Sequence, residues 1–281
     1  MKLMEINNKK SILITGCSTG IGFVVAQALQ QQGYRVFATA RKEADVTKLN
    51  EMGLESLQLD LDDSNSIQTA VKEILKRTNG TLYALFNNGA YGQAGAVEDL
   101  SRDVLRQQFE TNVFGWHELT TLIIPVMLKQ GYGRIIQNSS VLGFVTLKFR
   151  GAYSASKYAI EGLSDTLRQE LMGTNIFVSL VEPGPIESQF RKNSFAMYKK
   201  HINKETSRFK SEYTATEERL TKDGPAVPFT LSADAVFKKV LHALESDKPK
   251  PRYYVTAPTY VFGYLKRFLS TRVMDKILNH V

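Results

Sequence analysis

The sequence predicts an α/β fold in which a parallel sheet carries helices on both faces, the doubly wound arrangement. Short runs rich in β-branched residues alternate along the chain with longer segments whose apolar residues recur at helical spacing. The short runs are continuously apolar, which is typical of strands covered on both sides. No repeat, low-complexity tract or linker divides the chain, so we expect a single domain over residues 1–281.

The predicted elements follow one another in regular order. Strands are expected at residues 11–15, 35–39, 54–59, 82–86, 134–137 and 176–181. Helices are expected at residues 21–32, 65–78, 100–130 and 152–172. Asp62 and Asp63 are interpreted as the end of a strand and the start of a helix, and Ser232 as the cap of a later helix.

The composition is that of a globular protein with a full core. Of the 281 residues, 43% are hydrophobic and 23% are charged. The single cysteine, Cys17, excludes an intramolecular disulfide and favours a reducing compartment. Residues 1–10 contain no long apolar run, so no signal peptide is expected, and no uncharged apolar stretch approaches the roughly 18 residues of a membrane-spanning helix. We therefore expect a soluble, cytoplasmic protein.

The net charge of +8 is unevenly distributed. Residues 190–281 contain 18 Lys and Arg against 9 Asp and Glu, whereas residues 1–189 contain 18 against 19. A solvated basic face, an anionic membrane surface, an acidic substrate or nucleic acid could each explain this excess. We expect no nucleic-acid partner.

Residues 190–231 are polar and charged with scattered aromatic side chains. They follow the last predicted strand, at the sheet edge where ligands bind in doubly wound folds. We interpret them as a lid over a substrate cleft. A plain surface insertion is the alternative.

Three glycines, Gly16, Gly20 and Gly22, follow the first strand and open the first helix. Glycines permit a tight turn and let the backbone approach a pyrophosphate, whose charge is favoured at a helix N-terminus. The spacing is G-x-x-x-G-x-G rather than the commoner G-x-G-x-x-G. A dinucleotide site is therefore predicted, with a simple turn as the alternative.

The end of the second strand bears on the choice of dinucleotide. NAD sites place a carboxylate there for the ribose 2′-hydroxyl, but this chain has Arg41 and Lys42 and no acid until Glu43. A 2′-phosphate would find a bidentate partner in Arg41 and a second cation in Lys42. We therefore expect NADP(H). The alternative is that Arg41 and Lys42 are only surface cations on a loop, which would predict little discrimination between NADP(H) and NAD(H).

Tyr153 and Lys157 lie four residues apart in a predicted helix and so share one face. A free tyrosine, with a pKa of about 10, is a poor acid or base at neutral pH. A neighbouring lysine cation favours the phenolate and would lower the tyrosine pKa. The alternative is an ordinary solvated helix face.

Together these motifs resemble the short-chain dehydrogenase/reductase family, in the subgroup with a three-residue gap in the glycine motif, over residues 10–190. The resemblance implies a Rossmann-type sheet and a catalytic set of Asn112, Ser140, Tyr153 and Lys157. It implies cofactor contacts from Gly16, Ser18, Thr19, Gly20, Ile21, Gly22, Arg41, Lys42, Asp60, Leu61, Asn87, Tyr153, Lys157, Pro183, Gly184, Ile186 and Ser188.

Two positions depart from the family pattern. Gly89 and Ala90 are exchanged relative to the family's Asn-Asn-Ala-Gly motif, which moves the conformational freedom of glycine by one residue. Ser188 replaces a threonine and retains its hydroxyl.

The resemblance also implies a mechanism. Tyr153 would protonate the carbonyl oxygen as hydride reaches the carbon, and Ser140 would donate a hydrogen bond to that oxygen. Lys157 would lower the Tyr153 pKa and bind the nicotinamide ribose, and Asn112 would hold a water linking Lys157 to solvent. Ser139 is the rival of Ser140, and the family spacing favours Ser140.

The expected substrate is a lipophilic ketone or aldehyde and its alcohol. Residues 92–97 and 143–150 should border the cleft, and their apolar character suits such a compound. The pattern is similar to bacterial relatives of 17β-hydroxysteroid and retinol dehydrogenases, which implies a steroid, retinoid or fatty carbonyl. A catalytically silent nucleotide-sensing or membrane-surface protein is the alternative function.

Residues 258–281 are predicted to form amphipathic helices with nearby cations. The apolar stripe contains Tyr260, Val261, Tyr264, Leu265 and Phe268 and continues beyond a cap at Ser270 or Thr271. Such a segment can lie on a membrane surface, or it can pack in the core or in a dimer. A homodimer or homotetramer is expected. The four histidines are scattered without ligand spacing, so no metal site is predicted, and Cys17 is interpreted as a packing residue.

Overall fold

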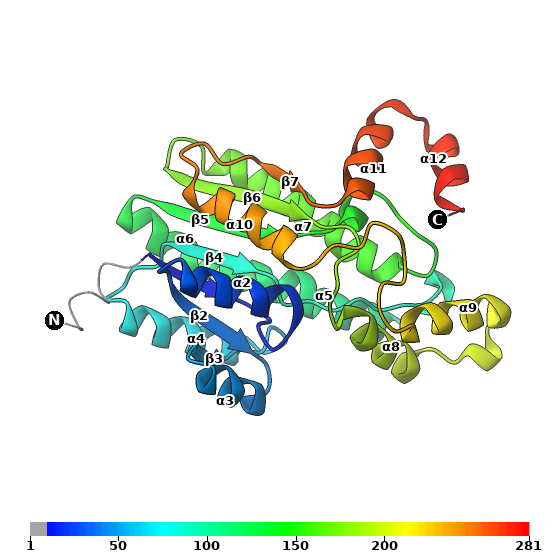
Figure 1. Ribbon diagram of the computed structural model, residues 1–281, viewed down its shortest axis with the longest axis horizontal. Coiled ribbons are helices and arrows are strands. Elements are labelled where there is room, and N and C mark those ends of the chain that lie inside the picture. The colour runs from blue at the N-terminus through cyan, green and yellow to red at the C-terminus, as the bar shows by residue number, and fades with distance from the viewer. Residues whose placement is uncertain (1–9, 281) are drawn as a thin grey trace.

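A computed structural model describes residues 10–280 of the chain; Val281 and the first nine residues, where no signal peptide is expected, lie outside it. One parallel sheet runs through the molecule in the order β3-β2-β1-β4-β5-β6-β7 (Figure 1). The strands are β1 (Ser11–Ile14), β2 (Arg35–Ala40), β3 (Glu55–Gln58), β4 (Ala84–Asn87), β5 (Gly133–Asn138), β6 (Ile176–Glu182) and β7 (Arg252–Tyr254). The order reverses between β1 and β4, which places a binding crevice at their carboxyl ends. The predicted fold class is confirmed.

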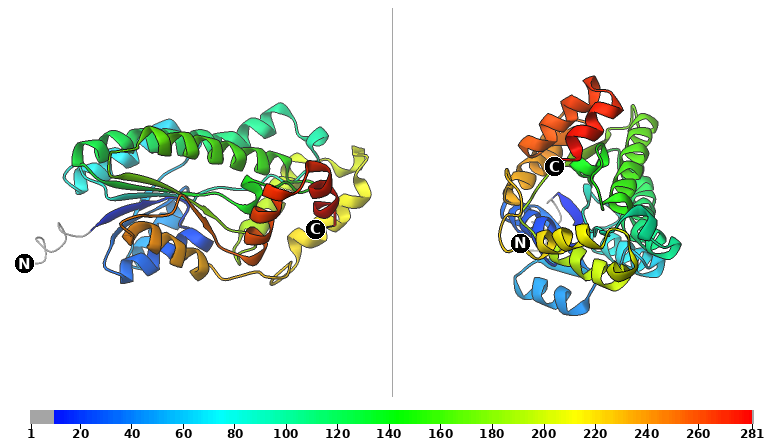
Figure 2. Two further views of the ribbon diagram at one scale, coloured as in Figure 1. Left: turned by 90° about the horizontal axis from the view of Figure 1, so that it is seen from above. Right: turned by 90° about the vertical axis from the view of Figure 1, so that its right-hand side faces the viewer.

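Helices cover both faces of this sheet (Figure 2). One layer contains α2 (Gly20–Gln31), α3 (Glu43–Glu51) and α10 (Asp234–Glu245), and the other contains α4 (Ser64–Arg77), α6 (Gly115–Gln130) and α7 (Gly151–Glu170). Each layer has its own core. Val25, Leu29 and Val240 belong to the first, whereas Leu119 and Ile160 belong to the second. The continuously apolar strands thus face side chains on both sides.

All the predicted strands and helical regions form, with shifted ends. The expected helix at residues 100–130 is divided into α5 (Arg102–Phe109), a π-helical turn at Glu110–Phe114, and α6. α3 and β7 were not predicted. β7 has only three residues, and its place is set by parallel pairing with β6 rather than by a local apolar pattern.

The two predicted helix starts have different outcomes. The Asp63 carboxylate accepts a hydrogen bond of 2.9 Å from the Asn65 amide and caps α4, as expected. The prediction that Ser232 caps α10 is wrong. Its hydroxyl donates to the Asp234 carboxylate at 3.0 Å, and the N-cap position belongs to Ala233.

Residues 190–231 fold into a helical hairpin at the carboxyl end of the sheet, formed by α8 (Phe190–His201) and α9 (Lys210–Thr221) (Figure 1). Most of its aromatic rings form a small core of their own. Tyr198 and Tyr213 are buried with ring centroids 5.4 Å apart. Only Phe190 packs on Tyr153, with centroids 5.2 Å apart. The mobility expected of a lid stays a prediction.

The C-terminal segment is helical, as expected, and forms α11 (Ala257–Phe268) and α12 (Thr271–Leu278). Leu265 and Met274 pack into a cluster that contains Tyr153. Tyr264 and Phe268 are exposed. Within residues 10–280, no helix combines the length and apolar character needed to cross a membrane.

We predict that Tyr213→Phe destabilises the protein by about 1–3 kcal/mol. The buried Tyr213 hydroxyl accepts from the Ala96 amide at 2.8 Å and donates to the Asp99 carboxylate. Its removal leaves a buried donor without a partner. Urea unfolding measures the loss, and Tyr132→Phe, at an exposed position, is the matched control. Equal stability of the two variants would contradict the importance of these bonds.

Candidate active site

Tyr153 and Lys157 occupy successive turns of α7 and both are buried, with exposed fractions of 9% and 1%. The Lys157 ammonium donates a 2.7 Å hydrogen bond to the main-chain carbonyl of Asn138, at the end of β5. It also lies 4.3 Å from the centroid of the Trp116 ring and 5.6 Å from that of Tyr153. These contacts exclude a solvated helix face and set both head groups at the carboxyl edge of the sheet.

Burial controls the protonation of this pair. It raises the pKa of Tyr153 to about 12, although a hydrogen bond with the Ser140 side chain opposes the shift. It lowers the pKa of Lys157 to about 7, against the effect of the Glu161 carboxylate. The net shift of the Tyr153 pKa is therefore opposite to the one expected from Lys157. The ammonium bonds to Asn138, and the apolar surroundings of the phenol dominate, so Tyr153 is protonated at neutral pH.

The structure distinguishes the two neighbouring serines after β5. The Ser140 hydroxyl lies beside Tyr153, where it opposes the rise of the phenol pKa, and its oxygen accepts a 3.1 Å hydrogen bond from the Leu142 amide. Ser139 instead lies against Gly143, since a Cβ built on Gly143 would be 2.6 Å from the Ser139 hydroxyl oxygen. Ser140 is therefore the hydroxyl that stands beside the phenol, as the sequence spacing suggested.

Asn112 lies in the π-helical turn between α5 and α6, and its side chain is fully buried. Its oxygen accepts from the Tyr91 amide at 3.2 Å. Its nitrogen donates to the Tyr91 carbonyl at 3.0 Å and to the Ser156 hydroxyl at 3.1 Å. The side chain thus ties the segment after β4 to α7. π-Helical turns often occur at functional sites.

The glycine loop between β1 and α2 has the close approaches that the motif predicts. Gly16 has a φ of +69°, and a Cβ on it would lie 2.5 Å from the Gly89 Cα. A Cβ on Gly22 would lie 2.3 Å from the Gly16 carbonyl oxygen. Neither position accepts a side chain, so this turn depends on both glycines.

The N-terminus of α2 can accept the diphosphate of a dinucleotide. Its N-cap residue, Thr19, makes no side-chain capping bond, and the first turn contains no acid. Free amide groups and the helix dipole favour an anion there. Ser18 and Thr19 are exposed and Gly20 is partly exposed, whereas Ile21 packs on the core. The loop therefore fits the predicted cofactor.

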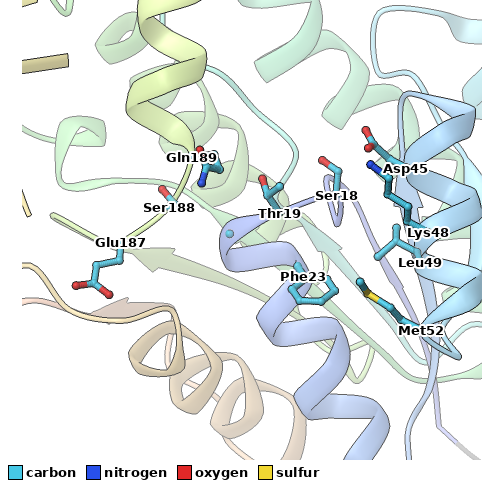
Figure 3. A pocket seen from close by; sticks show the side chains of 11 residues that line it. Ser18, Thr19, Phe23, Asp45, Lys48, Leu49, Met52, Glu187, Ser188 and Gln189 are labelled. Carbon is cyan, nitrogen blue, oxygen red and sulfur yellow. The ribbon is translucent and has the colours of Figure 1, made fainter. Parts of the chain in front are cut away.

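A cavity of about 500 Å³ opens beside this loop (Figure 3). Its walls come from the glycine loop, from α3 and from the segment before α8. They comprise Ser18, Thr19, Gly20, Phe23, Asp45, Lys48, Leu49, Met52, Glu187, Ser188 and Gln189. The α3 side of the cavity has no signal in the sequence, because that short helix has only one buried residue, Leu49.

The loop after β4 supports the glycine loop. Asn88 donates to the Thr15 carbonyl at 3.0 Å, and the Thr15 hydroxyl accepts from the Gly89 amide at 2.9 Å. Gly89 has no positive φ, so the exchange with Ala90 leaves ordinary backbone. Asn87 is fully buried and its side chain donates to Thr120 at 3.0 Å. Only the main chain of Asn87 could therefore make the contact expected with the cofactor.

The predicted 2′-phosphate ligands lie at the end of β2. Arg41 and Lys42 are both exposed, and neither forms an ion pair with any residue in the range 10–280. Asp60 is half-buried after β3, and its carboxylate accepts from the Asp62 amide at 3.1 Å. Leu61 is buried in the core of the second layer.

The segment after β6 is connected to both sides of the site. The Pro183 carbonyl accepts a 2.9 Å hydrogen bond from Val141, next to Ser140, and Gly184 lies against Thr256. Ile186 packs on the core of the first layer. The Ser188 hydroxyl accepts from the Phe190 amide at 3.3 Å. A Cβ built on Gly20 would lie 3.1 Å from the Cβ of Ser188.

The surroundings of Tyr153 are apolar. They come from the loop after β5, from the start of α8 and from α11 and α12. The cluster contains Val141, Leu142, Phe144, Val145, Leu147, Phe190, Phe262, Leu265, Leu269, Met274 and Leu278. Gly92 makes room for Phe190, since a Cβ on it would lie 2.6 Å from that ring. A hydrophobic wall is therefore present around Tyr153, and the C-terminal helices belong to it.

A buried acidic cluster beside the site was not foreseen. The Arg252 guanidinium lies 3.0 Å from Glu161, 2.6 Å from Asp165 and 3.2 Å from Glu182. Burial and the Glu161 charge raise the pKa of Glu182 to about 9, so Glu182 holds a proton at neutral pH. Arg252 and Glu182 are far apart in sequence from each other and from Glu161 and Asp165 on α7, and no local pattern signals their contact.

The remaining candidate groups are the single cysteine and possible metal ligands. The Cys17 thiol is fully buried and donates to the Ile14 carbonyl, and burial raises its pKa to about 12. It is a packing residue rather than a nucleophile, as predicted. Among residues 10–280, no three His, Cys, Asp or Glu side chains converge as metal ligands would.

The chain is similar to known oxidoreductases. A family model described as short chain dehydrogenase matches residues 10–199. The "Uncharacterized oxidoreductase YbbO" of Escherichia coli (strain K12) is 44% identical over 96% of this chain and 94% of its own length. The NADPH-dependent 3-dehydrocapnine reductase of Ornithobacterium rhinotracheale is 30% identical over 94% of both chains. Human 17-beta-hydroxysteroid dehydrogenase type 1 is 30% identical over 87% of this chain and 77% of its own.

The fold is also found in solved structures. A short-chain dehydrogenase/reductase from Burkholderia phymatum in complex with NAD superposes with a TM-score of 0.76. It shares 23% identity and covers 96% of this chain and 95% of its own. The likeness confirms the predicted Rossmann-type arrangement.

We predict that Glu182→Gln flattens the pH dependence of stability between about pH 5 and 9. The folded state keeps the Glu182 proton up to about pH 9, whereas the unfolded carboxyl, with a reference value of 4.5, releases it much earlier. Folded protein binds more protons in this window, so the free energy of unfolding falls as pH rises, by at most about 1.4 kcal/mol per unit. Glutamine mimics the neutral carboxyl and removes this slope.

Urea unfolding at pH 6 and at pH 9 measures the difference. Glu187→Gln, at an exposed carboxylate in the following loop, is the control and should keep the wild-type slope. Parallel slopes for wild type and Glu182→Gln would show that Glu182 holds no such proton.

Proposed function

We propose that this chain, which belongs to the short-chain dehydrogenase/reductase family of oxidoreductases, uses NADP(H) to interconvert a lipophilic ketone or aldehyde and its alcohol. One observation carries the proposal. A protonated tyrosine, beside a serine hydroxyl, is surrounded by apolar side chains at the carboxyl edge of a parallel sheet that is typical of dinucleotide binding. Such a group can protonate a carbonyl oxygen where water is largely excluded.

NADP(H), when bound, supplies or accepts the hydride. Gly16, Gly20 and Gly22 would admit the diphosphate to the N-terminus of α2. Arg41 and Lys42 would hold a 2′-phosphate. They stand where an NAD site would have a carboxylate for the ribose 2′-hydroxyl. The similar 3-dehydrocapnine reductase is described as NADPH-dependent, which supports the same choice here.

Tyr153 and Ser140 would act on the substrate oxygen. The Ser140 hydroxyl donates a hydrogen bond to the oxygen as negative charge grows on it, and the Tyr153 hydroxyl transfers its proton to the same atom. Because Tyr153 is protonated at neutral pH, the site is prepared for carbonyl reduction. Alcohol oxidation would require the phenol to lose its proton first.

Lys157 and Asn112 would support this step. The Lys157 ammonium is held on the Asn138 carbonyl, from which it would reach the nicotinamide ribose and favour the phenolate left after proton transfer. Asn112 fixes the segment at Tyr91 against α7. The water that Asn112 is expected to hold would restore the Tyr153 proton through Lys157.

The substrate class follows from the wall of the site. Phe144, Leu147 and Phe190 lie with Tyr153 in a cluster of apolar side chains. A steroid, retinoid or fatty carbonyl would bury apolar surface against such a wall, whereas a sugar or small organic acid would lose hydrogen bonds to water. The similar human protein is named for a hydroxysteroid.

The remaining expectations concern assembly and location. Leu105 on α5, Phe114 at the end of the π-helical turn before α6, and Leu163 on α7 are exposed. These exposed apolar side chains support pairing of two copies through this part of the molecule. A homodimer or homotetramer and a cytoplasmic location stay predictions, and sedimentation velocity would measure the first.

We predict that Tyr153→Phe lowers kcat by at least about 100-fold, because general acid catalysis contributes that much. NADPH should still bind, since the phenyl ring keeps the packing with Phe190. Turnover of steroid and retinal substrates, followed by NADPH absorbance, tests the loss, and fluorescence titration tests binding. Retained turnover would exclude Tyr153 as the proton donor.

We predict that Arg41→Asp weakens NADPH far more than NADH, by at least about tenfold in relative affinity, because a charged hydrogen bond becomes a repulsion. Titration of both nucleotides measures the ratio. Arg102→Asp, at an exposed position on α5, is the matched control and should leave the ratio unchanged. An equal loss for both nucleotides would refute the assignment of Arg41.

A further inference from the structure

The proposed chemistry leaves one part of the chain unexplained, the segment that follows α10. Residues 248–274 contain six cations, Lys248, Lys250, Arg252, Lys266, Arg267 and Arg272, and no acidic residue. Arg252 is bound to the buried acidic cluster. No ion pair within residues 10–280 involves the other five. The segment therefore presents uncompensated positive charge.

The same segment exposes large apolar side chains. α11 is apolar on two faces. Phe262 and Leu265 point to the cluster around Tyr153, whereas Val261, Tyr264 and Phe268 are exposed by 53%, 58% and 82%. The exposed residues are three and four positions apart, so they form a continuous stripe along the helix. Such a stripe beside free cations is unusual on a protein surface that meets only water.

A cleft of about 230 Å³ lies next to this stripe, between α10, β7 and α11. Lys239, Lys250, Arg252 and Arg267 supply cations to its wall, and Tyr253, Tyr254, Tyr260, Gly263 and Tyr264 complete it. The Tyr254 ring packs on Gly263 and lies edge-on to Tyr260, with centroids 5.4 Å apart. The cleft thus combines positive charge with tyrosine rings at the foot of the apolar stripe.

We propose that this surface, formed by the α11 stripe and the adjoining cationic cleft, docks the protein on a lipid bilayer that contains anionic phospholipids. The stripe inserts Val261 and Phe268 at the level of the headgroups, and the tyrosines lie at the boundary that their amphipathic rings prefer. Lys239, Lys250 and Arg267 of the cleft, together with Lys266, contact phosphate groups.

Charge complementarity favours a bilayer over a second copy of this chain. Two copies meeting through this surface would bring both sets of free cations together, which opposes pairing. An anionic surface instead attracts Lys250, Lys266 and Arg267 at once. No membrane-spanning helix exists within residues 10–280, so the contact is peripheral.

The location of the surface gives the docking a consequence for the site. α11 and α12 lie beside the carboxyl end of the sheet, as do α8 and α9 (Figures 1 and 2). The inner face of α11 belongs to the apolar wall around Tyr153, and its outer face carries the stripe. One helix thus separates the bilayer from the place where a lipophilic substrate would react.

Vesicle sedimentation tests the docking without reference to turnover. Wild-type protein should sediment with phosphatidylcholine vesicles that contain 30% phosphatidylglycerol, and much less with pure phosphatidylcholine. Raising the salt should weaken the binding because charge contacts are screened. Phe268→Asp should lower the partition coefficient at least about tenfold through loss of apolar insertion. Lys250→Glu with Arg267→Glu should lower it by about fivefold or more for each cation lost.

Matched controls use exposed residues outside the surface. Met172→Asp is as exposed as the stripe residues, and Lys72→Glu reverses an exposed charge on α4. Both should bind vesicles like the wild type. Circular dichroism and thermal unfolding confirm that each variant is folded, and failure of the enzyme assay would leave the vesicle result unaffected.

Three results would overturn the proposal. The first is equal sedimentation with both kinds of vesicle, or no loss in Phe268→Asp. The second is no vesicle binding together with an oligomeric state that Phe268→Asp changes in sedimentation velocity, which would assign the stripe to a second copy. The third is calorimetric binding of glycerol phosphate by the cleft without vesicle binding, which would assign it to a soluble anion.

Discussion

The hydrogen bond from the Lys157 ammonium to the Asn138 carbonyl is the interaction on which the site depends. It joins α7 to the end of β5 inside the protein, where a charged group without a partner would be costly. The same end of β5 continues into Ser140, and the same helix carries Tyr153. Because the Asn138 side chain also donates to Asn88, the bond connects α7 to the loops that would face a dinucleotide. Displacing the ammonium would disturb all these segments together.

The apolar wall around Tyr153 determines what the pair can do. Burial raises the pKa of the phenol and lowers that of the neighbouring ammonium, so the phenol is neutral at pH 7. A neutral phenol is a proton donor, which suits reduction. Under the proposed function, Ser140, whose hydroxyl lies beside the phenol, would share the substrate oxygen with it. The surroundings therefore contribute to the chemistry as much as the residues themselves.

The C-terminal helices connect the reaction to the surface. α11 contributes Phe262 and Leu265 to the wall of the site and exposes Tyr264 and Phe268 on its outer face. β7, which precedes it, anchors Arg252 in the acidic cluster behind α7. A protein that reduces a lipophilic carbonyl and docks on a bilayer would thus use one segment for both tasks. The two proposals have separate tests because vesicle binding does not require turnover.

The sequence by itself determined the sheet, the glycine loop and the pairing of Tyr153 with Lys157, because these follow from periodicity, close backbone approach and helical spacing. Only the tertiary structure showed that β7 joins the sheet, that Asn87 points into the core and that Arg252 meets Glu161 and Glu182. It also reversed the expected pKa shift of Tyr153. Local spacing predicts which groups are neighbours, but desolvation and contacts between distant segments arise only when the whole chain packs.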